Sequence, residues 1–154
     1  MKLALNGALT IGTDDGANIE IRQSVGEANI FIFGLRTPQV QALKQHGHRP
    51  LRHYEANPAL KAALDAIADG TFSPDEPGRY RPLVDTLLWG GDPYCLLADY
   101  EDYVATQARV DELYRRPDEW AQRAIANVAG MGVFSSDRTI REYATQIWGV
   151  LPNP

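Results

Sequence analysis

The stretch LTIGTDDGANIEIRQSVGEANIFIFG, residues 9–34, decides the fold class of this chain. A short apolar, β-branched run at 9–12 ends in a glycine and predicts a buried strand. A helix is predicted over 17–25, with Asp15 as its N-cap. Continuous apolarity over 29–33 predicts a second strand, buried on both faces as in a parallel sheet. Strand, helix and strand within so short a span form the βαβ pattern of α/β proteins.

The sequence that follows Gly34 is mainly helical in pattern. Thr37-Pro38 and Asn57-Pro58 each supply an N-cap and a first-turn proline. Cys95 to Leu97 form a candidate third strand. Helices are predicted from capping signals and apolar spacing at 37–45, 58–68, 80–89, 99–114, 117–128 and 138–148. Two or three strands against about seven helices are too few for a complete α/β domain, because a parallel strand needs a neighbour. We therefore expect a helix-rich α/β chain with an incomplete sheet.

Composition and charge exclude several classes of protein. The 154 residues are 44% apolar and 23% charged, which is typical of a soluble globular domain. A net charge of -5 argues against binding to nucleic acid or to an anionic membrane, since either partner requires a basic face. The apolar runs are too short to span a bilayer, and the amino-terminal residues lack the plan of a signal peptide. A single cysteine suits a reducing compartment, so we expect a cytoplasmic protein.

The glycines at 7, 12 and 16 suggest a phosphate-binding loop, but only weakly. Gly7 and Gly12 have the Walker spacing, yet Thr13-Asp14 follows, which places an acid where the lysine belongs. Glycines that serve tight turns are the favoured interpretation. A small nucleotide-binding domain is therefore the weakest of the functional alternatives.

Other reactive residues do not form a catalytic or metal-binding pattern. His46, His48 and His53 lack a carboxylate or thiol at ligand spacing, so we assign them to a solvated loop and expect no metal. Cys95 lies in an apolar run and is interpreted as a small core residue. The cluster at 135–137 has no nearby histidine and is explained by helix capping. Five aromatic residues on helical stripes are also assigned to the core: Tyr100, Tyr103, Trp120, Tyr143 and Trp148.

A series of ordered motifs resembles the α-glucan phosphorylases (glycogen, starch and maltodextrin phosphorylase). The motifs extend over essentially the whole chain. They are Lys2 with 5–13, 15–20, 26–29, 31–34, 72–74, 98–100, 103–104, 134–140, 142–144 and 147–148. Without this resemblance, a lysine at position 2 would be assigned to a solvated terminus.

The resemblance implies a retaining glycosyltransferase with two Rossmann-like domains that face a cleft. In that family, the lysine that matches Lys2 holds pyridoxal phosphate as a Schiff base. Phosphate attacks an α-1,4-glucan and releases α-glucose 1-phosphate, and the cofactor phosphate acts in proton transfer. Residues 1–154 match the carboxyl-terminal portion of the second, cofactor-binding domain. Lys2 is the only position that carries over as a cofactor contact, and no catalytic residue does.

The resemblance also implies that the substrate-binding residues of the family precede Lys2. We therefore expect this chain to be inactive alone and to act with the amino-terminal part of a phosphorylase. The alternative is a non-catalytic interaction module, which pairs with another chain or with itself. Apolar surface left exposed by an incomplete sheet would favour such association.

Overall fold

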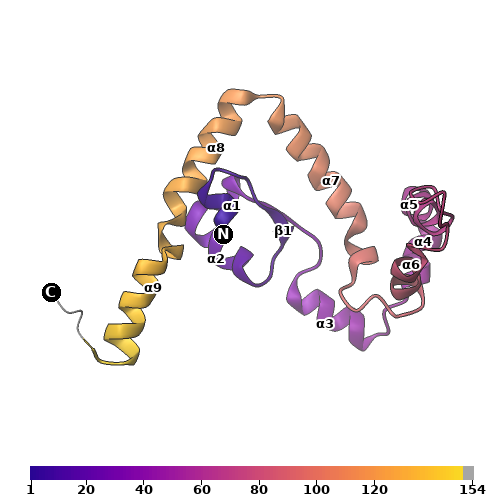
Figure 1. The fold of residues 1–154 in the computed structure, drawn as a ribbon, viewed down its shortest axis with the longest axis horizontal. Helices are drawn as coiled ribbons and strands as arrows, with labels where there is room; N and C mark the ends of the chain where they lie inside the picture. The colour runs from indigo at the N-terminus through magenta and orange to yellow at the C-terminus, as the bar shows by residue number, and fades with distance from the viewer. Residues whose placement is uncertain (151–154) are drawn as a thin grey trace. The chain divides into compact units, whose positions relative to one another are not determined.

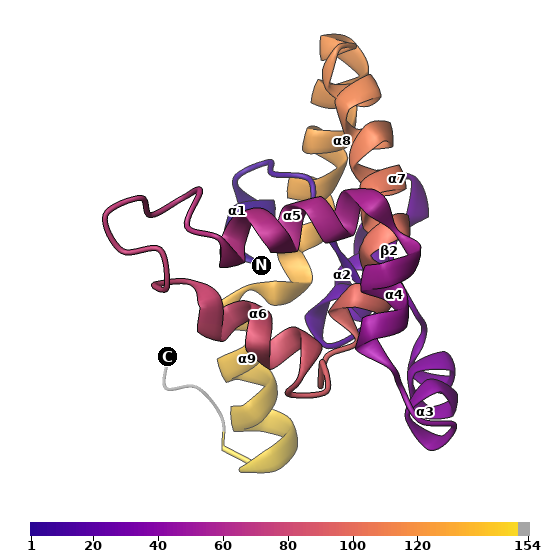
Figure 2. The same ribbon diagram turned by 90° about the vertical axis from the view of Figure 1, so that its right-hand side faces the viewer.

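A computed structural model describes residues 1–150 and divides the chain into two compact units (Figures 1 and 2). Unit 1 is discontinuous and consists of residues 1–32 together with residues from 108 onward. Unit 2 is the continuous stretch 33–107. Within residues 1–150, no helix is long and apolar enough to cross a bilayer.

Unit 1 contains the βαβ element that the sequence predicts. Strands β1 and β2 pair in parallel, and the amide of Phe31 donates to the carbonyl of Thr10 at 2.9 Å. Helix α2 covers the predicted 17–25 and ends at Gly26, whose φ of 84° lies in the left-handed region that favours glycine. The elements of unit 1 before the chain leaves it are α1 (Lys2–Leu5), β1 (Ile11–Thr13), α2 (Ala17–Val25), a 3-10 turn (Glu27–Asn29) and β2 (Phe31–Phe33).

The carboxyl-terminal helices complete unit 1 and bury its apolar side chains. They are α8 (Pro117–Gly130), a 3-10 turn (Met131–Phe134), α9 (Ser136–Glu142) and a π-helical turn (Tyr143–Ile147). Helices α1 and α2 both contact α8. One core cluster consists of Ala4, Ile21, Val25, Ile30 and Met131. A second consists of Phe31, Val110 and Leu113.

Unit 2 is built from helices alone, apart from the last residue of β2. Its helices are α3 (Thr37–Gln45), α4 (Pro50–Ala56), α5 (Pro58–Ala68), α6 (Arg81–Leu88) and the first half of α7 (Leu96–Tyr114). Helices α4, α5 and α6 pack on one another (Figure 2). The side chain of Asn57 caps α5, as predicted, by accepting the amide of Leu60 at 2.9 Å. The core of this unit consists of Leu60, Leu64, Val84 and Leu97.

Two sequence predictions about the start of α7 are wrong. Residues 95–97 are not a strand, because Cys95 adopts a left-handed φ of 57° and the helix begins at Leu96. The helix was predicted to begin at Asp99, but Asp99 lies inside its first turn, where the carboxylate accepts the amide of Leu35 at 2.8 Å. Helix α4 contains His53, for which a loop was predicted.

The assignment of aromatic stripes to the core is wrong for three residues. Tyr103, Tyr143 and Trp148 are 39%, 46% and 61% exposed. Helical spacing correctly marked an apolar face in the helices that carry these residues, but it does not show whether another element covers that face.

The prediction that Asp15 caps α2 is also wrong. The N-cap is Gly16, and the carboxylate of Asp15 accepts the hydroxyl of Thr13.

Candidate functional site

Lys2 lies on a short helix that is fixed to the core of unit 1. Ala4, on the same helix, is 2% exposed and packs in the cluster with Met131. Gly7 then turns the chain with a φ of 85°, close to Ala124 on α8. The side chain of Lys2 is exposed, and its carbonyl accepts the side-chain amide of Asn6 at 2.8 Å. The backbone of Lys2 is therefore ordered by buried neighbours while its amine faces solvent.

Lys2 differs from the other two lysines of the chain in having an unengaged amine. Lys44 Nζ donates to the carbonyl of Pro93 at 2.7 Å. Lys61 Nζ donates to Tyr54 and to Asp65, and these hydrogen bonds raise the pKa of Lys61. Lys2 makes no side-chain hydrogen bond or ion pair with any residue in the described part of the chain. Among the described residues, Lys2 is therefore the lysine whose exposed amine no hydrogen bond occupies, and such an amine can react with an aldehyde.

Side-chain contacts hold the glycine-rich segment that follows Lys2, and these contacts do not form a phosphate-binding loop. Asn18 Nδ2 donates to the carbonyl of Thr13 at 2.9 Å, and a Cβ at Gly12 would lie 2.5 Å from that Nδ2. Asp14 forms an ion pair with Arg22 at 3.2 Å. This geometry favours the interpretation that the glycines serve close packing and turns.

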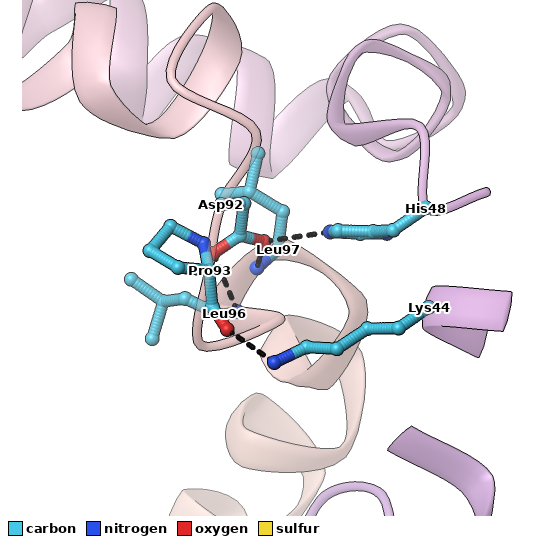
Figure 3. A network of polar contacts seen from close by, with 6 residues as sticks. All are labelled: Lys44, His48, Asp92, Pro93, Leu96 and Leu97. Atoms are coloured by element: carbon cyan, nitrogen blue, oxygen red, sulfur yellow. Dashed lines mark hydrogen bonds and ion pairs between the residues drawn. The ribbon is translucent and has the colours of Figure 1, made fainter. Parts of the chain in front are cut away.

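A buried polar network joins the segment after α3 to the start of α7 (Figure 3). Both oxygens of Asp92 accept helix amides, that of Leu96 at Oδ1 and that of Leu97 at Oδ2, each at 2.9 Å. His48 Nε2 lies 3.0 Å from Oδ2 of Asp92. Because it accepts the first amides of α7, Asp92 caps the amino-terminal end of that helix. The side chains of Asp92 and His48 are 1% and 6% exposed, so His48 is its buried partner.

His48 is therefore buried, and the prediction that it lies in a solvated loop is wrong. The two partners are 44 residues apart, and no local pattern links them. The sequence does contain one indication of this network, since an aspartate between a Gly-Gly pair and a long helix is a capping position.

His53 is close to His48, with ring centroids 5.5 Å apart. Its pKa is lowered by burial and by the neighbouring His48.

The remaining candidates show no sign of chemistry. Cys95 is fully buried, as predicted, and burial raises the pKa of its thiol. That environment disfavours the reactive thiolate. Across residues 1–150, no group of three or more histidine, cysteine or acidic side chains is arranged to hold a metal ion.

The βαβ element and the many helices make this a helix-rich α/β protein. Its two strands do not by themselves form a complete sheet. The family model for carbohydrate phosphorylases matches residues 1–150. The chain belongs to the carbohydrate phosphorylase family.

Individual relatives are similar over nearly the whole chain. Glycogen phosphorylase of Synechocystis sp. is 53% identical over 152 residues. The brain form of glycogen phosphorylase of Homo sapiens is 51% identical over 153 residues, and glycogen phosphorylase of Haemophilus influenzae is 50% identical over 152. In each case the match covers 99% of this chain and 18% of the relative. The chain thus spans less than a fifth of the length of these relatives.

Proposed function

We propose that this chain is the carboxyl-terminal portion of the cofactor-binding domain of a pyridoxal-phosphate-dependent glucan phosphorylase, with Lys2 as the residue that attaches the cofactor. The observation that carries the proposal is about 50% identity to glycogen phosphorylases over 99% of the chain. The open amine of Lys2 on an anchored helix supports the assignment of that residue.

The residues present fit one end of this cofactor. Attachment to its aldehyde requires an accessible amine, and Lys2 provides one. The cofactor phosphate requires cations or N–H donors, and Lys2 is the only cationic side chain on α1. In the segment after α1 the charge of Asp14 is paired with Arg22, and the carboxylate of Asp15 would repel a phosphate. When bound, the cofactor supplies a phosphate that can exchange protons with the substrate phosphate.

The chain itself therefore contributes attachment and support. Lys2 holds the cofactor in place, and the packing of Ala4 fixes the position of the lysine backbone. Groups that bind substrate phosphate, α-1,4-glucan and the cofactor phosphate come from the rest of a phosphorylase. In this proposal the chain alone releases no α-glucose 1-phosphate, and the complete enzyme works in the cytoplasm.

A labelling experiment tests the role of Lys2. The chain is incubated with pyridoxal phosphate, reduced with borohydride and mapped by peptide mass spectrometry. We expect the label on Lys2 in preference to Lys44 and Lys61, whose amines are engaged. Lys2→Arg removes the label, and Lys44→Arg serves as the matched control that keeps it. Equal labelling of all three lysines would refute the assignment.

An activity experiment tests whether catalysis requires both this chain and the rest of a phosphorylase. Glucose 1-phosphate is measured from glycogen and phosphate, first with this chain alone and then with a phosphorylase chain that ends just before the matching lysine. We expect no product from either chain alone and recovered activity from the mixture, abolished by Lys2→Ala. Product from this chain alone would contradict the proposal.

Association through an apolar face is a second candidate function. Ile140, Ile147 and Trp148 near the carboxyl end are 58%, 66% and 61% exposed. A surface of this kind on a monomer commonly marks an interaction site. Sedimentation of the chain and of Ile147→Glu distinguishes the two candidates. A dimer that this substitution dissociates would favour the association module, and a monomer would exclude self-association through this face.

A further inference from the structure

Helices α4, α5 and α6 surround a cleft of about 360 Å³ within unit 2. Its apolar lining consists of Leu51, Ala68, Val84 and Leu88. Its polar lining consists of Tyr54, Asp65, Asp69, Arg81 and Asp85, and Trp89 completes it. A concave apolar base with a few convergent polar groups is the usual composition of a small-ligand site.

Trp89 is the least expected residue in this lining. Its side chain is 70% exposed although tryptophan is a residue that folding tends to bury. It lies at the carboxyl end of α6, where its amide donates to the carbonyl of Asp85 at 2.9 Å. The indole thus presents a large flat apolar face, with one N–H donor, beside a polar cleft.

The carboxylates in the cleft are oriented by their neighbours. Tyr54 and Lys61 donate to Asp65, and Thr71 donates its amide and its hydroxyl to Oδ1 of Asp69. These hydrogen bonds lower the pKa of both Asp65 and Asp69 and hold the two carboxylates in place. The two bonds from Thr71 both go to Oδ1, and a carboxylate can accept further hydrogen bonds from a ligand.

Charge and shape together select the class of ligand. Lys61 pairs with Asp65, and Arg81 lies 4.0 Å from Asp85. Within residues 1–150 this leaves the charge of Asp69 unbalanced, which disfavours a phosphorylated or otherwise anionic ligand. An apolar ring face fits the indole, and a row of hydroxyl groups fits ionised carboxylates, each of which accepts several hydrogen bonds. A pyranose ring combines one face of C–H groups with an edge of hydroxyls. We propose that this cleft binds a neutral glucose oligosaccharide, with one ring on Trp89 and its hydroxyls on Asp69 and Asp85.

This site is separate from Lys2 and requires neither the cofactor nor catalysis. Only the choice of an α-1,4-linked probe rests on the proposed function. The binding experiment uses the complete chain, which is titrated with maltoheptaose and followed by ¹H-¹⁵N NMR. We expect the indole N–H signal of Trp89 to shift, whereas the signals of Trp120 and Trp148 stay in place. The Lys2→Arg variant binds equally well, so its labelling result and this result are independent.

Two variants test the geometry. Trp89→Ala is expected to weaken binding at least about tenfold, since stacking on the ring is lost. Trp148→Ala removes a similarly exposed tryptophan and should leave the affinity unchanged. Asp69→Asn tests the second contact and should weaken binding severalfold while the fold, measured by circular dichroism, is retained.

The outcomes are decisive in either direction. The proposal is overturned if Trp89→Ala binds maltoheptaose as tightly as the unchanged chain does. It is also overturned if no NMR signal shifts at about 10 mM sugar, roughly a 20-fold molar excess over protein, a concentration at which a weak ligand is bound. Equal binding of glucose 6-phosphate would also contradict it, because the acidic lining should exclude an anion.

Discussion

Replacing Asp92 with alanine tests whether one buried carboxylate holds the start of α7. The change removes the acceptor for the amides of Leu96 and Leu97 and the partner of His48. A hydrogen bond to a charged acceptor contributes about 1.5–3 kcal/mol, although Leu96 is half exposed and water replaces part of its bond. Asp92 also has a φ of 45°, which costs alanine about 1 kcal/mol more than aspartate.

Together these terms lower the free energy of unfolding by about 4 kcal/mol for Asp92→Ala. Asp92→Asn keeps one acceptor oxygen and tolerates the left-handed backbone, so about 2 kcal/mol is expected. Urea denaturation at pH 7, followed by circular dichroism, measures both. Asp111→Ala, an exposed position on the same helix, is the control and should change stability by less than about 0.5 kcal/mol. If Asp92→Ala behaves like this control, the capping network does not stabilise the unit.

Three further changes probe other parts of the fold. Gly34→Ala should lower the free energy of unfolding by about 2 kcal/mol in the same urea assay, because φ is 80° and a Cβ would lie 2.6 Å from the Asp99 carboxylate. Leu64→Ala should cost about 3 kcal/mol by opening a cavity in unit 2, whereas the exposed Leu83→Ala should cost almost nothing; similar midpoints for the two would contradict the assigned core. The lowered pKa of His53 means that the unfolded chain binds a proton more readily than the folded chain does, so His53 makes stability fall as the pH drops below about 6.5. His53→Gln should flatten that part of the curve of urea midpoint against pH, and an unchanged slope would show that His53 is not the group responsible.

Local patterns were sufficient to predict most of the elements. The βαβ unit follows from two apolar runs with a helical stretch between them, and α2 covers the predicted 17–25 although Asp15 does not cap it. Proline and asparagine signals located α5 because Asn57 acts on an amide three residues away. Such interactions are encoded within one turn of helix, so a single sequence shows them.

Errors arose where distant residues decide the structure. The apolar run at 95–97 resembled a strand because a three-residue run has no measurable period. It becomes a helix start because Asp92 accepts the amides of Leu96 and Leu97 and is itself supported by His48. Helix α4 begins at Pro50, a favoured first-turn residue, but its seven residues are too few to show an apolar stripe.

The candidate sites divide in the same way. Lys2 was identified only through the family resemblance, because its exposure is ordinary for a residue near the amino terminus. The cleft beside Trp89 gave no signal in the sequence. Its lining comes from three helices, and the carboxylates within it are separated by a loop that no periodicity describes.

The discontinuous composition of unit 1 has a consequence for the order of folding during synthesis. Ala4 packs against Met131, so this core cannot close until the last helices have been translated. Unit 2 is continuous and complete once α7 has emerged. At ribosomal rates of about 5–20 residues per second, the 17 residues from the end of α7 to Met131 take about 1–3 s to make. During that interval the apolar side chains of the βαβ element lack the partners that cover them in the folded unit.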